Sequence, residues 1–107
     1  MATNRIRELN DAFRTTFAGG KVMLTAGVEA LPLNVKITLI ILVMNFSEFT
    51  PDNDPHGEHD FGSFELAGHK FFFKVDYYDP QLEFGSDDPA DPAKATRVLT
   101  IMLATEY

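Results

Sequence analysis

Apolar residues recur with two different spacings along this chain, and the spacing changes several times between its ends. Residues 3–17 have apolar positions three or four apart, at Ile6, Leu9, Phe13 and Phe17. That spacing places them on one side of a helix, with polar residues on the other. Thr3 or Asn4 is suited to cap its start, and Gly19-Gly20 to end it. Residues 21–25 then predict a short strand.

Strict alternation is clearest in residues 61–66 and 69–78, which flank Ala67 and Gly68. Two alternating runs joined by a two-residue turn predict a β-hairpin. In the second run, one face holds Phe71, Phe73, Val75 and Tyr77. The other holds Phe72, Lys74, Asp76 and Tyr78, a mixture that suits partial exposure.

Residues 33–46 fit both periods. Their β-branched content favours a strand, whereas the length of the segment and Pro32 just before it favour a helix. We predict a helix, which has more apolar surface than one contact with a core requires.

Residues 92–103 predict a terminal helix, since Asp91 and Pro92 suit a helix cap and first turn. Its buried face would be Ala95, Val98, Leu99, Met102 and Leu103. The expected order is therefore α-β-α-β-β-α. Residues 1–107 are expected to form a single α+β domain of two layers, with a three-stranded antiparallel or mixed sheet covered by helices.

Charge is concentrated in the middle of the chain. The net charge is −7, and residues 48–92 hold twelve acidic and two basic side chains. A surface of that sign repels phosphate, which disfavours direct nucleic-acid binding and suits a basic protein or a cation. The chain has no cysteine, which fits a reducing cytoplasm, and we expect neither a signal peptide nor a membrane span.

The loop at residues 49–62 is rich in potential ligands. Imidazole and carboxylate groups suit zinc, manganese or iron. A metal site would use Asp54, His56, His59 and Asp60, with Glu58 as a further candidate. The alternative is structural, with side chains that cap turns and bond to the backbone. No complete catalytic motif is present, so no catalytic residue is assigned.

Two phenylalanines, Phe49 and Phe61, bracket this loop. We expect both rings to be buried and to hold the loop ends. Asp52 and Asp60 are expected to accept backbone N–H hydrogen bonds inside the loop.

Five blocks carry a family resemblance: FTPDNDP at 49–55, GEHDFG at 57–62, KVDYYD at 74–79, DPADP at 88–92 and RVLTIMLA at 97–104. Together they resemble domain-of-unknown-function family 3768, small proteins found largely in alphaproteobacteria and often on plasmids. Because no activity is established for that family, the resemblance supplies neither a cofactor nor a mechanism. This chain departs from the family pattern in residues 34–46, where the family resembles a charged amphipathic helix and this stretch is strongly apolar.

The resulting hypothesis is a small acidic cytoplasmic accessory protein that binds a macromolecular partner with a basic surface. Plasmid association in the resembled family suggests an inhibitor of a nucleic-acid-binding enzyme, such as a bacterial defence effector. The alternative is a metal-binding protein or metal-dependent enzyme that uses the loop. Oligomeric state is left open, and the expected binding residues are Asp52, Asp54, His56, Glu58, His59, Asp60, Asp76, Tyr78, Glu83, Asp87 and Asp88.

Overall fold

A four-stranded mixed sheet with helices forms the fold in the computed structural model, which describes residues 2–107. The elements are α1 (Ala2–Thr16), β1 (Gly20–Leu24), α2 (Ala26–Glu29), α3 (Leu33–Met44), β2 (Phe61–Leu66), β3 (His69–Tyr78), β4 (Thr96–Leu103) and the 3₁₀ turn η1 (Ala104–Glu106). Strand order is β1-β4-β3-β2, with β1 parallel to β4 and the other neighbours antiparallel. The predicted α+β class is confirmed, but the predicted number of strands is wrong.

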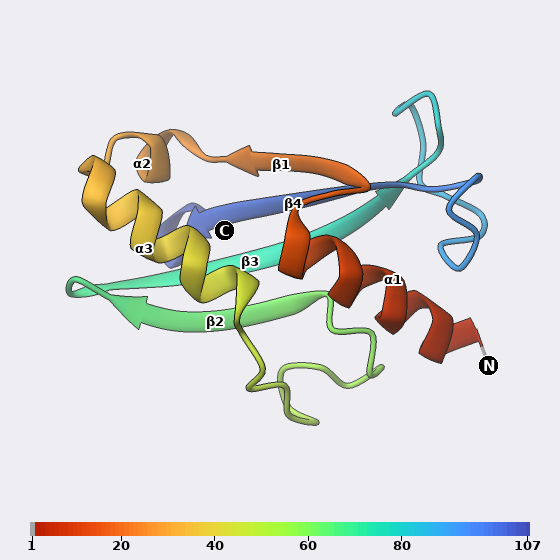
Figure 1. Cartoon of the computed structure of the whole chain (residues 1–107), viewed down its shortest axis with the longest axis horizontal. Helices are drawn as coiled ribbons and strands as arrows, with labels where there is room; N and C mark the ends of the chain where they lie inside the picture. Colours follow the sequence, from red (N-terminus) through yellow and green to blue (C-terminus); the bar gives the residue numbers. More distant parts are fainter. Residues whose placement is uncertain (1) are drawn as a thin grey trace.

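Helices α1 and α3 cover one face of the sheet (Figure 1). Between the layers lies a core of Phe13, Val28, Leu39, Val43, Phe71, Phe73, Val75, Leu99 and Ile101. The predicted inner face of the long strand is confirmed, because Phe71, Phe73 and Val75 are all buried. Each such side chain contributes about 1.5–3 kcal/mol relative to an exposed position.

Residues Leu33–Met44 form a helix, as predicted. Leu39 and Val43 are fully buried on its inner side, whereas Ile37 and Ile41 on the outer side are 51% and 52% exposed. As a strand, this almost wholly apolar segment would place apolar side chains on both faces and would need both faces covered. In the structure only one side of the segment packs against the core. The expected excess of apolar surface on this helix is therefore confirmed.

The predicted terminal helix at 92–103 is wrong: residues 92–95 belong to a loop, and Thr96–Leu103 forms β4, an interior strand of the sheet. Arg97, Leu99 and Ile101 are buried in alternation, as in a strand. Met102, on the opposite face, is also buried. A central strand with apolar residues on both faces loses its period of two, so its sequence imitates a helical stripe. Asp91 instead caps a turn, accepting a hydrogen bond from the Ala93 N–H at 2.9 Å.

The sheet face away from α1 and α3 carries an aromatic cluster. Phe61 and Phe72 lie 5.1 Å apart between ring centroids, and the ring of Tyr107 is edge-on to both. Phe61 is therefore half-buried on this face and does not pin the loop to the core, contrary to the prediction. Phe49 does pack against the core, beside Phe46 and Phe73, and is also only half-buried.

Candidate functional site: the acidic end of the sheet

Two acidic loops lie at the same end of the sheet. The first, residues 48–60, leads into β2, and the second, residues 79–95, joins β3 to β4. Because β2 runs antiparallel to β3, the start of one strand lies beside the end of the other. In Figure 1 the first loop lies at the bottom, below β2 and α1, and the second lies at the upper right, on the other side of α1. We call these two loops the acidic pole.

Carboxylates dominate this acidic pole. Its acidic residues are Glu48, Asp52, Asp54, Glu58, Asp60, Asp79, Glu83, Asp87, Asp88 and Asp91. Lys94 is the one lysine or arginine in the two loops. Arg7 on α1 reaches the first loop and donates a hydrogen bond to the Gly57 carbonyl at 3.1 Å. The two loops therefore bring an excess of negative charge to this end of the sheet.

A buried carboxylate organises the first loop. Asp54 is 8% exposed, and its Oδ1 accepts hydrogen bonds from the Glu58 N–H at 3.0 Å and the His59 N–H at 3.2 Å. The Asp54 N–H in turn donates to the Thr50 carbonyl. Asp54 thus has the role that we predicted for Asp52 and Asp60. Within residues 2–107, no backbone N–H of another residue is found to donate to either of those two carboxylates.

His59 fastens the loop to α1. Its ring stacks on Phe49 with centroids 3.9 Å apart and planes 3° from parallel. Nδ1 lies 2.9 Å from Asp11 Oδ1, and Nε2 lies 3.7 Å from Asp54 Oδ2. The backbone φ of 56° is uncommon for a residue with a side chain. These contacts hold the imidazole between two carboxylates, so its first role is to secure the loop.

Arg14 forms the base of this contact. It is 3% exposed and donates to the Phe46 carbonyl at 2.9 Å and to Asp11 Oδ1 at 2.9 Å. The guanidinium carbon also lies 5.2 Å from the centroid of the Phe49 ring. A buried cation needs such partners to offset its lost hydration. Arg14 therefore joins the end of α3, the first loop and α1.

A second network links the two loops through Asn10. Its amide donates to the Glu58 carbonyl at 3.0 Å and to the Tyr77 hydroxyl at 2.8 Å. Its side-chain carbonyl accepts from Arg97 Nε at 2.7 Å. Arg97 Nη2 also donates to the Pro89 carbonyl in the second loop at 2.6 Å. Asn10 and Arg97 thus connect both acidic loops to the centre of the sheet.

Tyr77 is a hydrogen-bond donor inside this network. Its hydroxyl donates to Glu58 Oε1 at 2.8 Å. Burial, followed by the nearby Glu58 carboxylate, raises the pKa of Tyr77, although its bond with Asn10 acts in the opposite direction. Burial also lowers the pKa of Arg97. In both residues, burial disfavours the charged form of the side chain. We interpret the hydrogen bonds of Tyr77 and Arg97 as structural support for the two loops and not as a proton-transfer site.

The predicted binding residues divide into three groups. Asp52, His56, Glu83 and Asp87 are exposed at the pole, with Asp60 and Asp88 half-buried there. Asp54, Glu58 and His59 bond within the loop support described above. Asp76 and Tyr78 lie on the opposite sheet face, where the Asp76 carboxylate pairs with Lys74 Nζ at 3.1 Å.

Of the four predicted metal ligands, the structure brings Asp54 and His59 together, at 3.7 Å. His56 is exposed at the loop surface. Across residues 2–107, no three His, Cys, Asp or Glu side chains form a group that fits a metal ion. The metal-binding alternative therefore stays a prediction.

Sequence reasoning missed Asn10, Asp11, Arg14 and Arg97, which support the site. All four lie far from the loops in sequence, or in a segment predicted as a different element. The one local signal is that Asn10 and Arg14 are four residues apart, on the same side of α1 as Phe13. Polar residues beside an apolar stripe are common, so this signal alone does not identify a buried network.

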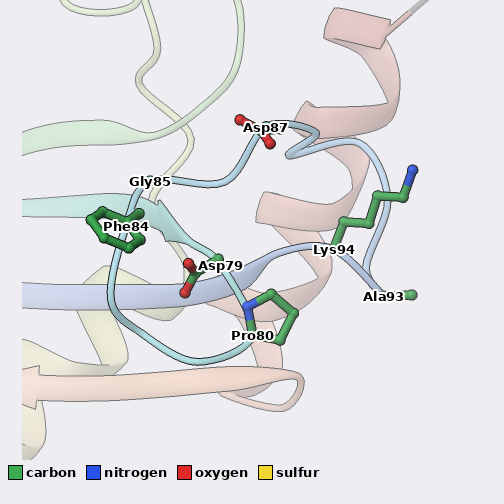
Figure 2. A pocket seen from close by; sticks show the side chains of 7 residues that line it. All are labelled: Asp79, Pro80, Phe84, Gly85, Asp87, Ala93 and Lys94. Carbon is green, nitrogen blue, oxygen red and sulfur yellow. The ribbon is translucent and has the colours of Figure 1, made fainter.

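A pocket of about 470 Å³ opens within the second loop. Its lining residues are Asp79, Pro80, Phe84, Gly85, Asp87, Ala93 and Lys94 (Figure 2). The turn after β3 is closed by its own hydrogen bonds, since the Glu83 N–H donates to Asp79 Oδ1 at 3.0 Å and the Asp79 N–H to the Phe84 carbonyl at 2.7 Å.

Fold and site together define a small α+β domain with one acidic, internally braced end. The chain belongs to the protein family of unknown function DUF3768, whose model matches residues 24–106. No curated protein and no solved structure matches it. In the part of the chain that the structure describes, no helix is both long and apolar enough to cross a membrane. Helix α1, which supports both loops, precedes the matched range.

Proposed function

We propose that this protein acts by binding a macromolecular partner with a basic surface through the acidic pole. The observation that carries the proposal is the position of the two acidic loops at one end of the sheet, joined by Asn10 and Arg97. A braced loop loses less conformational entropy when it binds than a free one. Concentrated charge of one sign also accelerates encounter with an oppositely charged partner.

A finer proposal is that the partner is an enzyme that binds nucleic acid, such as a bacterial defence effector, in the cytoplasm. Carboxylates spaced over a rigid surface can occupy sites in a basic channel that otherwise receive phosphates. This proposal makes a distinct prediction, because DNA or RNA should compete with the protein for the same partner.

The test compares two variants with equal changes in charge. The first neutralises the pole with Glu83→Gln, Asp87→Asn and Asp88→Asn. The control neutralises three carboxylates outside the pole, with Glu8→Gln, Glu29→Gln and Glu65→Gln. Immobilised wild type and control should retain a host protein that the pole variant loses, and 0.5 M salt should release it.

Capture of the same proteins by all three forms would contradict the proposal. If capture depends on the pole but excess DNA does not displace the captured protein, the inhibitor proposal fails and the more general binding proposal stands.

A further inference from the structure

The pocket in the second loop combines charged and apolar walls in a way that suits one kind of side chain. Asp79 and Asp87 contribute carboxylates, and Pro80, Phe84 and Ala93 contribute apolar surface. Figure 2 shows the Phe84 ring and the Asp79 carboxylate on the turn after β3, with Asp87 and Lys94 on the returning segment. We propose that this pocket receives an arginine side chain of the basic partner.

The exposed aromatic ring distinguishes this pocket from a merely acidic surface. Phe84 is 71% exposed, although it lies on a turn that its own backbone helps to close. Leaving that ring in water costs apolar free energy, which a bound partner would recover. A planar guanidinium stacks on an aromatic face and also bonds to carboxylates through paired N–H groups. A lysine ammonium provides the charge without the planar contact.

The negative charge of the pocket is only partly neutralised by other residues of the chain. Among residues 2–107, the ion pairs found do not include Asp79 or Asp87. The lining has two carboxylates and one ammonium, from Lys94. The remaining negative charge favours a cationic occupant over an anion or an uncharged apolar group.

The pocket is also preformed. The Ser86 N–H donates to the Tyr77 carbonyl at 3.0 Å, and the Ser86 hydroxyl donates to the Lys94 carbonyl at 2.7 Å. These bonds tie the two sides of the loop to each other and to the end of β3. A guest side chain therefore meets walls that need little ordering on binding.

The experiment titrates the ¹⁵N-labelled full chain with the capped peptide acetyl-Gly-Arg-Gly-amide, followed by NMR. The citrulline version of the peptide removes the charge and keeps the shape, and the lysine version removes the planar group. We expect saturable shifts concentrated at residues 79–94, with a dissociation constant on the order of millimolar. Binding should weaken at least about threefold with lysine and be lost with citrulline.

Two variants test the walls, and two control them. Asp87→Asn and Phe84→Leu change exposed residues and should each weaken binding of the arginine peptide at least about threefold. Glu65→Gln and Tyr107→Leu likewise neutralise a carboxylate and remove an aromatic ring, at exposed sites outside the pole, and should change binding by less than about twofold. Equal binding of the citrulline peptide, shifts elsewhere, or no effect of either wall variant would overturn the proposal.

This inference rests on the proposed function, yet the two fail separately. If host-protein capture depends on the pole while the arginine peptide does not use the pocket, the pocket assignment alone is wrong. If the peptide binds as expected while no partner depends on the pole, the pocket binds guanidinium groups and the macromolecular function is wrong.

Discussion

Asp54 and His56 are two residues apart in the first acidic loop and have opposite environments. Asp54 is buried and accepts two backbone N–H groups, whereas His56 is exposed. Removing an acceptor from buried donors costs about 1–3 kcal/mol, and exposed substitutions usually cost less than about 0.5 kcal/mol. We therefore expect Asp54→Ala, but not His56→Ala, to lower the free energy of unfolding in denaturant melts.

The same pair of variants tests the metal alternative. A costly His56→Ala, together with stoichiometric metal in untagged protein and a melting temperature that falls with chelator, would support a metal site. Those results would replace the structural interpretation of the loop.

Asp60 gives the loop a pH-dependent cost. Burial, and then the charge of Glu58, raises the pKa of Asp60 above its ordinary value of 3.8. The folded state therefore disfavours the ionised carboxylate. This loss of folding stability is absent well below pH 3.8, where Asp60 is protonated in both the folded and the unfolded chain. It is complete above the raised pKa, where Asp60 is ionised in both.

Asp60→Asn should thus stabilise the protein at pH 7, by less than about 1 kcal/mol because the group is partly solvated. Denaturant melts between pH 3 and 8 should show the gain disappearing as the pH falls below 3.8. A gain that stays constant with pH would contradict the electrostatic explanation.

Helix α1 acts at the scale of elements, because it connects both acidic loops with the sheet. Asn10→Ala would leave Arg97 Nε and the Tyr77 hydroxyl without one partner each. We expect a loss of about 1–3 kcal/mol in denaturant melts. Hydrogen exchange should also accelerate in both loops, at residues 54–59 and 86–91.

Asn34→Ala, at an exposed position of α3, is the matched control and should cost less than about 0.5 kcal/mol. If Asn10→Ala accelerates exchange in neither loop, α1 does not brace the pole.

The close packing of Phe46, two residues beyond α3, against the hairpin depends on a glycine. A Cβ added to Gly62 would lie 2.2 Å from the Phe73 ring and 3.0 Å from Phe46. Overpacking of this kind costs about 1–3 kcal/mol. Gly62→Ala should therefore lower the denaturation midpoint, while Gly85→Ala, whose nearest contact would be 3.9 Å away, should leave it nearly unchanged. Equal effects would show that the close approach is not what Gly62 provides.

At the scale of the whole molecule, the negative pole destabilises the folded chain through self-repulsion. Raising the salt concentration from about 0.05 to 0.5 M shortens the screening length from roughly 14 to 4 Å. The melting temperature of the wild type should therefore rise with salt. The rise should be smaller in the triple pole variant Glu83→Gln, Asp87→Asn and Asp88→Asn than in the matched triple control. Equal rises would show that the charge is not concentrated as described.

The local sequence by itself determined the elements that bury only one face, because their apolar residues then keep a regular spacing. The hairpin of β2 and β3 alternates cleanly because one of its faces is buried, and α1 and α3 have stripes that meet a single layer. The charge of the pole is also a property of composition, readable without a fold.

Tertiary structure alone decided β4. This strand has apolar residues on both faces, with Leu99 and Ile101 buried on one and Met102 on the other, so its sequence imitates a helix. It also decided the support of the acidic loops. Asn10 and Arg97 are 87 residues apart, and no local rule pairs them. The two residues meet between α1 and the sheet, where the Asn10 side-chain carbonyl accepts a hydrogen bond from Arg97 Nε. Both groups are buried, and without this bond each would lack that partner.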